Sequence, residues 1–284
     1  MNRQLRALIK ASSSSLEKSS IGRLALLTAA SLAARLVTKR SISFRRIGNC
    51  WFRVDGGATL PVGTTLELNR GSMMSWEEGG EEMSRPRRGW WFRYYSPSPG
   101  DIVLDVGAGR GEDVLVFSEV VGPTGKVVAV EAHPETFEIL KAFVRLNRLG
   151  NVHLENYAAC DKRGTLLMAH ETEEHWQCAA IVRSCGDGVP VPATRIDDLP
   201  QLARAPRVAF VKMNIEGAEV EALRGASETL VKTDRICVCC HDFLSMRTRT
   251  KAEVKAILTK HGFRLFSAPP GAPPYESDFV YGTR

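Results

Sequence analysis

A strand, a glycine-rich turn and a helix between residues 102 and 121 carry the most informative chemistry of this sequence. An apolar strand ends at Asp105, and the turn after it contains Gly107, Ala108, Gly109 and Gly111. Glycine permits positive φ and leaves the backbone bare, so a ligand can lie directly against it. In an open α/β sheet such a turn lies at the carboxyl edge, where these folds bind ligands.

The glycine spacing and the nearby acids narrow the class of ligand. A dinucleotide site needs G-x-G-x-x-G and holds a pyrophosphate at the helix N-terminus. Here the third glycine comes one residue early for that motif. The carboxylates of Glu112 and Asp113 would repel a phosphate, but they suit a ligand that carries a positively charged sulfonium and an amino group. Glu131 ends the next apolar strand, where an acid can hold both ribose hydroxyls. The pattern favours S-adenosylmethionine over NAD. A turn that merely connects strand to helix is the structural alternative.

Polar residues near the ends of two later strands could activate an acceptor. A hydroxyl becomes a good nucleophile when a base takes its proton, and histidine has an ordinary pKa near 6.5. We therefore predict His241 as the base, with Glu216 orienting it or the acceptor. The candidate catalytic residues are His241, Glu216, Lys212 and Asn214.

Two alternatives to this assignment stay open. Glu216 could cap a helix that begins at Gly217, since acids are common in a first helical turn, and His241 could also be structural. A divalent cation held by Asn214, His241 and Asp242 could instead stabilise an alkoxide. Hard cations prefer several carboxylates, and this set has one, so we predict no required metal.

Alternating strands and helices from residue 98 onward must position these groups. Strands are predicted at 102–105, 127–131, 152–156, 208–213, 236–241, 263–266 and 279–281, and helices at 112–121, 134–149 and 219–230. This alternation predicts a doubly wound, mostly parallel, seven-stranded Rossmann-like α/β sheet with helices on both faces. The last two strands would be antiparallel, and residues 165–192 indicate a hairpin or a mobile insertion.

We expect three segments: a basic extension at 1–50, an aromatic-rich lead-in or cap at 51–97, and the catalytic domain at 98–284. The aromatic residues of the second segment are Trp76, Trp90, Trp91, Phe92, Tyr94 and Tyr95. They could cover an outer face of the sheet. Alternatively they could close over an acceptor pocket, since stacked aromatic faces suit sugars and flat rings.

Charge is distributed unevenly along the chain. Residues 1–53 hold eleven Lys or Arg and one acid, so this segment carries +10, and subtracting it from the total of +6 leaves −4 for residues 54–284. The mildly acidic remainder predicts no nucleic-acid partner. Residues 21–37 are apolar except for Arg23 and Arg35, which makes them too short and too charged to span a bilayer comfortably. A basic helix on a membrane surface, a transit-like leader and a packing helix remain alternatives.

The seven cysteines lack paired spacing, which predicts a reducing compartment and hence the cytoplasm.

Several blocks, in a fixed order, resemble the FkbM-type methyltransferases. PGDIVLDVGAGRGE is similar to the opening strand and glycine turn of that family, and GKVVAVEAHPETFEIL to its second strand. NVHLENYAACDKRG resembles its third strand and adenine-side loop. The blocks VPATRIDDL and FVKMNIEGAEVEALRGA resemble the most specific part of the family, and the resemblance covers roughly residues 96–284.

The resemblance implies S-adenosylmethionine-dependent methylation, usually of a hydroxyl on a small molecule or sugar, and we expect the acceptor to be a small molecule, sugar or glycolipid. The implied cofactor residues are Asp105, Gly107, Ala108, Gly109, Gly111 and Asp113 in the cradle, Glu131, Ala132 and His133 at the ribose, and Ala159 and Asp161 at the adenine. The chain departs from the family at Asn214, where aspartate is usual. A non-catalytic cofactor-binding protein and a nucleic-acid methyltransferase stay open as alternatives, although no Asn-Pro-Pro-Tyr or Pro-Cys motif supports the latter.

Overall fold

The computed structural model describes residues 19–38, 42–48, 50–55, 58–63, 89–169, 188–240, 242, 249–269, 271–272 and 274–284. The chain divides into two compact units. The first comprises Met1–Pro86 with Arg145–Arg148, and the second Arg87–Val144 with Leu149–Arg284. Within the described residues, no helix is long and apolar enough to cross a membrane.

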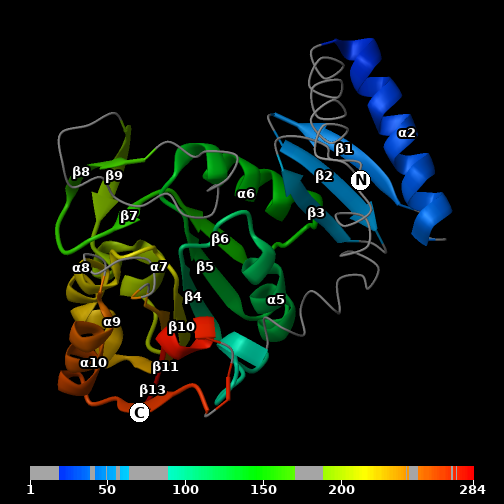
Figure 1. Ribbon diagram of the computed structural model, residues 1–284. Helices are drawn as coiled ribbons and strands as arrows, with labels where there is room; N and C mark the ends of the chain where they lie inside the picture. The colour runs from blue at the N-terminus through cyan, green and yellow to red at the C-terminus, as the bar shows by residue number, and fades with distance from the viewer. Residues whose placement is uncertain are drawn as a thin grey trace. The chain divides into compact units, whose positions relative to one another are not determined.

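The first unit is built from one helix and a small antiparallel sheet (Figure 1). Its elements are α2 (Ser20–Thr38), β1 (Ser43–Ile47), β2 (Cys50–Asp55) and β3 (Ala58–Gly63), with strand order β1-β2-β3. Ala30 of α2 and Trp51 of β2 are fully buried and form its apolar centre. The boundary expected between residues 50 and 51 falls within the β1–β2 hairpin, since Arg46 pairs with Trp51. Asn147 joins this unit through two hydrogen bonds of 2.8 Å with the backbone of Thr59.

The second unit contains the seven-stranded sheet predicted from the sequence, in the order β12-β13-β11-β10-β4-β5-β6. The strands are β4 (Ile102–Val106), β5 (Lys126–Val130), β6 (Val152–Glu155), β10 (Val208–Met213), β11 (Thr233–Cys239), β12 (Arg264–Ser267) and β13 (Phe279–Thr283). β4, β5, β6, β10 and β11 pair in parallel, and β13 runs antiparallel to both of its neighbours. The carboxyl ends of β10, β4 and β5 therefore meet at one edge of the sheet, as the site requires.

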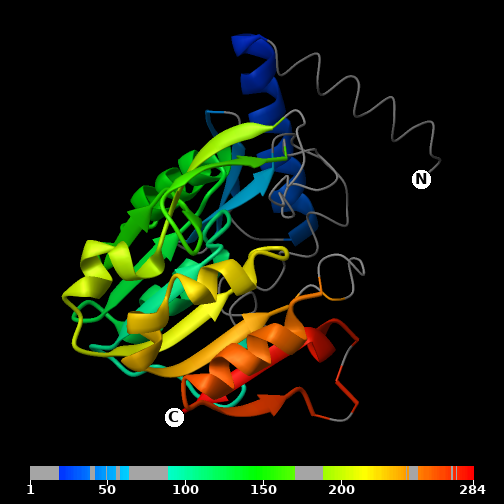
Figure 2. The same ribbon diagram turned by 90° about the vertical axis from the view of Figure 1, so that its left-hand side faces the viewer.

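Helices cover both faces of this sheet (Figures 1 and 2). They are α5 (Glu112–Val121), α6 (Pro134–Leu146), α7 (Pro200–Ala203), α8 (Glu219–Arg224), α9 (Ser227–Val231) and α10 (Lys251–Lys260). Phe117 of α5 and Leu140 of α6 are buried in one core layer. The opposite core layer contains the buried side chains of Leu202 from α7, Leu223 from α8 and Leu258 from α10. The prediction of a doubly wound α/β sheet is thus confirmed.

The aromatic residues before β4 pack on the sheet. The Trp91 ring stacks on Phe279 with centroids 5.2 Å apart, and Phe92 meets Phe210 edge-on at 5.5 Å. Tyr94 stacks on Phe266, also with a centroid distance of 5.2 Å. These contacts support the first of the two alternatives, in which the aromatic residues cover the sheet. Trp76 lies outside the described residues.

The helix predicted at 219–230 is interrupted at Gly225. A Cβ atom there would lie 1.9 Å from the carbonyl oxygen of Cys160, so only glycine fits. The Gly225 carbonyl accepts a hydrogen bond from the Asp197 N–H at 3.0 Å. This close approach explains why two short helices replace the predicted long one.

A second small sheet lies beside this break, with order β7-β9-β8. It consists of β7 (Ala158–Ala159), β8 (Gly164–Met168) and β9 (Val189–Thr194), followed by the 3₁₀ helix η1 (Ile196–Asp198). β8 and β9 are antiparallel, as expected for a hairpin, and residues 170–187 between them lie outside the described residues.

Candidate active site

The glycine turn joins the ends of three strands. Gly107 has φ 80°, and its N–H donates to the Val130 carbonyl at 2.9 Å. A Cβ atom on Gly107 would lie 2.0 Å from the Asn214 carbonyl oxygen, so β4 and β10 leave no room for a side chain. Gly111 meets a similar limit, because its Cβ would lie 2.4 Å from the Phe143 ring. Gly109 differs: with φ 57°, no described atom lies within 4 Å of its Cβ position, which leaves this part of the turn bare.

Matched alanine substitutions distinguish these two roles. Both Gly107→Ala and Gly109→Ala put a side chain on a left-handed residue, which costs about 1–2 kcal/mol. Gly107→Ala should cost about 1–3 kcal/mol more, since its methyl group must displace backbone. Gly109→Ala should fold but bind S-adenosylmethionine weakly, because its methyl group occupies the bare face. Urea unfolding and titration calorimetry measure both effects, and equal stability of the two variants would contradict this assignment.

The carboxylate of Glu131 is fixed directly beside the turn. Its Oε2 accepts the Gly109 N–H at 2.9 Å, and its Oε1 accepts the His133 N–H at 2.8 Å. An oxygen of an ionised carboxylate can accept two hydrogen bonds, so this group suits a diol. The Asn156 amide holds the loop by donating to the carbonyls of Glu131 and Ala132 at 2.8 and 3.1 Å. Asn156 is absent from the sequence-based site, although a polar residue just after β6 could have signalled it.

Lys212 lies at the centre of a buried polar cluster beneath the turn. Its Nζ donates to the Gly107 carbonyl at 2.6 Å and lies 2.8 Å from Asp105 Oδ1 and 3.5 Å from Asp113 Oδ2. Asp113 Oδ1 also accepts the Trp91 indole N–H at 2.9 Å. The Lys212 side chain is 1% exposed, and that of Asp105 is 0% exposed. Burial alone would lower the pKa of Lys212, but the two carboxylates outweigh it and raise this pKa.

This cluster changes the interpretation of three predicted residues. Lys212 was predicted to be catalytic, and Asp105 and Asp113 to bind the cofactor. Instead the three side chains face one another, because Lys212 and Asp105 are direct neighbours in the β10–β4 register. The ammonium group of Lys212 is enclosed by these acceptors, which favours a positioning role at the glycine turn over the predicted catalytic role.

The segment after β10 places Asn214 and Glu216 at the carboxyl edge. The Asn214 N–H donates to the Val106 carbonyl at 3.0 Å, which keeps it beside the glycine turn. Glu216 has φ 54°, and Gly217 after it has φ 97°. A non-glycine residue in this conformation is strained, and such strain is concentrated at functional sites. α8 begins at Glu219 rather than at Gly217, and Glu219 Oε1 accepts the Gly217 N–H at 3.0 Å.

His241 lies outside the described residues, but its two neighbours are well anchored. The Cys240 N–H donates to the Asp278 carbonyl at 3.0 Å. Asp242 Oδ1 accepts the N–H groups of Thr250 and Lys251 at 2.8 and 3.1 Å, and so caps α10. Asp242 Oδ1 is thus engaged at the start of α10, and the metal alternative, which also needs His241, stays untested.

The predicted adenine side is built from β7 and the loop after it. Ala159 is buried in β7, whereas Asp161 is exposed and accepts a 3.4 Å contact from the Cys160 thiol. Ala132 packs against the apolar cluster that contains Cys160. The loop carrying Glu131 and the loop carrying Asp161 are therefore neighbours, as the sequence-based site requires.

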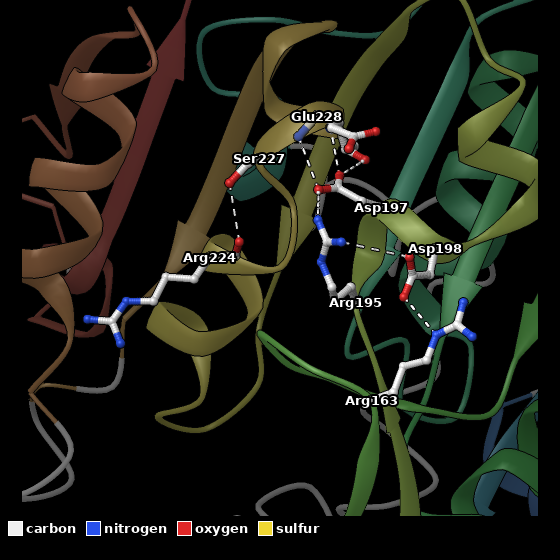
Figure 3. A network of polar contacts seen from close by, with 8 residues as sticks. Arg163, Arg195, Asp197, Asp198, Arg224, Ser227 and Glu228 are labelled. Carbon is white, nitrogen blue, oxygen red and sulfur yellow. Dashed lines mark hydrogen bonds and ion pairs between the residues drawn. The ribbon is translucent and has the colours of Figure 1, made fainter.

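A polar network joins Arg163, in the loop after β7, to η1 and α9 (Figure 3). Asp197, in η1, accepts the N–H groups of Glu228 and Thr229 at 3.1 and 2.8 Å, and so caps α9 from another part of the chain. Arg195 pairs with Asp197 at 2.9 Å, and Arg163 pairs with Asp198 at the same distance (Figure 3). The acids of the R-I-D-D block thus hold the fold together around Gly225.

The methyltransferase FkbM domain model matches residues 105–265, which is 161 of the 284 residues. The chain belongs to the FkbM methyltransferase family. The matched region begins at Asp105 and includes the glycine turn, Glu131, the Asp197 network and the turn with Glu216. The resemblance seen in the sequence is therefore confirmed.

Curated relatives match only short stretches. A protein-L-isoaspartate O-methyltransferase of Aeropyrum pernix is 52% identical over 42 residues, covering 15% of this chain and 16% of that protein. The enzyme of the same name from Methanococcus maripaludis strain C6 is 45% identical over 67 residues, which cover 24% of this chain and 29% of that protein. This chain thus spans less than a third of the length of either relative.

Solved structures show more extended likeness at low identity. A methyltransferase FkbM from Methylobacillus flagellatus KT is 14% identical, with a TM-score of 0.47, covering 89% of this chain and 58% of that one. Aeropyrum pernix fibrillarin, solved with natively bound S-adenosylmethionine, is also 14% identical, with a TM-score of 0.43. The match covers 72% of this chain and 74% of that one.

Membership in the FkbM family confirms the prediction of an S-adenosylmethionine-dependent methyltransferase. The residues present fit this cofactor. Gly109 offers bare backbone, and Glu131 offers a carboxylate already oriented by two N–H groups. When bound, S-adenosylmethionine supplies an electrophilic methyl group on a positively charged sulfur.

Glu131→Gln should weaken S-adenosylmethionine binding about 10- to 100-fold, since it removes a charge-assisted hydrogen bond worth about 1.5–3 kcal/mol. Titration calorimetry measures this affinity, and urea unfolding checks that the variant is folded. Glu138→Gln is the matched control, because Glu138 on α6 is exposed and pairs only locally with Lys141. Equal affinities of the two variants would remove Glu131 from the cofactor site.

Proposed function

We propose that this protein transfers the methyl group of S-adenosylmethionine to a hydroxyl oxygen of a small molecule, sugar or glycolipid. The main support is the strained Glu216, which follows β10 two residues after Asn214. The Asn214 backbone contacts the glycine turn directly. A carboxylate and an amide held at this edge suit the binding and deprotonation of an alcohol.

In this proposal the protein supplies position and a proton acceptor. Asn214 and Glu216 orient the acceptor, and His241, which follows β11 in the sequence, takes the hydroxyl proton. Alignment of the attacking oxygen with the methyl carbon and sulfur then lowers the barrier by proximity. A cysteine nucleophile is less suited, because burial raises the pKa of both Cys237 and Cys240.

The chemical stability of the product tests this proposal. The protein is incubated with S-adenosylmethionine labelled in its methyl group and a panel of sugars, glycolipids and small alcohols. An ether made from a hydroxyl keeps its label in mild base, whereas a methyl ester made from a carboxylate releases methanol. We expect a base-stable product, and Glu131→Gln should lose most of the signal at limiting cofactor.

Other results would overturn the proposal in specific ways. A base-labile product on protein would point to carboxylate methylation, the activity named for the protein-L-isoaspartate relatives. Label transferred to RNA would support a nucleic-acid methyltransferase, despite the −4 charge of residues 54–284. Binding of S-adenosylmethionine without turnover on any acceptor would favour the non-catalytic alternative.

A further inference from the structure

Helix α2 is apolar on two opposite faces. One face packs on the small sheet of the first unit through Leu26, Ala30 and Ala34, which are buried. The opposite face consists of Ile21, Leu24, Leu32 and Leu36, whose exposed fractions are 84%, 65%, 58% and 73%. Their spacing of three, eight and four residues places them along one line of the helix. We call these four residues the outer face of α2.

The outer face is continuous and has few polar interruptions. Thr28 lies on the same line, but its hydroxyl donates to the Leu24 carbonyl at 2.9 Å and so needs no external partner. From Ile21 to Leu36 the line extends about 22 Å, at about 1.5 Å per residue. A helix that is apolar on all sides is normally enclosed, so an exposed apolar line marks an interaction surface.

The charge around the outer face favours one class of partner. Residues 1–53 carry +10, and the remaining 231 residues carry −4. Among the described residues, Arg35 lies in the last turn of α2 and Arg45 is exposed on β1, whose residues contact α2. A nucleic acid would complement the positive charge, but it would leave the apolar side chains of the outer face without contacts. A second copy of the chain would bring two segments of +10 together.

We propose that the outer face of α2 binds peripherally to an anionic lipid surface. The leucines would enter the boundary between headgroups and acyl chains, while the long arginine side chains reach the phosphates. α2 would lie in the plane of the surface. This inference rests on the first unit alone and does not depend on the methyl acceptor.

Sedimentation of the full-length protein with vesicles tests this surface. We expect binding to vesicles that contain phosphatidylserine, and little binding to pure phosphatidylcholine. Leu24→Ser and Leu32→Ser should each lower the partition coefficient about tenfold, since each removes an apolar side chain. Arg35→Gln should lower it about fivefold at low salt, and binding of the unaltered protein should fall as salt rises from about 0.1 to 1 M.

Val231→Ser is the matched control, because Val231 on α9 is 64% exposed and lies outside the basic segment. Point variants are preferable to removal of residues 1–50, which would take β1 out of its sheet. Vesicle binding that is unchanged in Leu24→Ser and Leu32→Ser would overturn the proposal. A dimer that dissociates in those variants, with no vesicle binding, would also overturn it and assign the outer face to self-association.

Discussion

Lys212→Met should lower the free energy of unfolding by about 3–5 kcal/mol, the usual cost of removing one partner from a buried ion pair. The variant leaves the carboxylates of Asp105 and Asp113 buried without the ammonium group that lies between them. It also removes the donor to the Gly107 carbonyl, so the glycine turn should loosen. Urea unfolding gives the stability, and titration calorimetry should show weaker S-adenosylmethionine binding even where the variant is folded.

Two comparisons make the Lys212 result specific. Lys162→Met changes an exposed lysine and should leave stability within about 0.5 kcal/mol of the original. Adding Asp105→Asn to Lys212→Met should cost less than the sum of the single variants, because the second change removes a carboxylate from which the first has taken the buried ammonium group. Additive costs would show that Lys212 and Asp105 do not act as a pair.

The pH dependence follows from the raised pKa of Lys212. A group whose pKa is higher in the folded state contributes its full stabilisation below its unfolded pKa, which is about 10.4 for lysine. The difference between the protein and Lys212→Met should therefore stay constant from neutral pH to about pH 10. It should shrink only as the pH rises through the folded pKa of Lys212.

The sequence predicted those parts of the site that depend on local pattern. The glycine spacing, the acid after the second strand and the helix at Glu112–Val121 follow from neighbouring residues alone. The contact of Gly109 with Glu131 then follows, because parallel strands β4 and β5 end at the same edge. Local patterns therefore sufficed to predict the fold class and to indicate that Glu131 lies beside the glycine turn.

The role of Lys212 could not be predicted in the same way. It depends on the pairing of β10 with β4, two strands that are about a hundred residues apart in sequence, and on a register that sets Lys212 beside Asp105. The break at Gly225 has a similar cause, since a distant carbonyl, that of Cys160, occupies the space of its missing side chain. Neither partner can be identified from the spacing of nearby residues.

His241→Ala should lower turnover by about two to four powers of ten if His241 removes the acceptor proton. Its effect on S-adenosylmethionine affinity should be small, because His241 follows β11 whereas the cofactor residues follow β4 and β5. The rate of the original protein should rise with pH through the titration of this base, near neutrality for an ordinary histidine. His153→Ala is the control, since His153 is exposed on β6. Full activity and an unchanged pH profile in His241→Ala would remove it from the mechanism.

Two substitutions at Glu216 then separate function from fold. Glu216→Gly relieves the strain of φ 54°, so the variant should be as stable as the original protein or more stable by up to about 1 kcal/mol. If the carboxylate orients the acceptor, the turnover of Glu216→Gly should nevertheless fall. The turnover of Glu216→Gln should fall less, because glutamine keeps the shape of the side chain and one oxygen acceptor. If Glu216 is itself the base, Glu216→Gln should lower turnover more than His241→Ala does. The rate of the Glu216→Gln variant should then no longer rise with pH. Stable variants with full turnover would show that the strained residue serves only the turn between β10 and α8, and a different group at this edge would have to activate the acceptor.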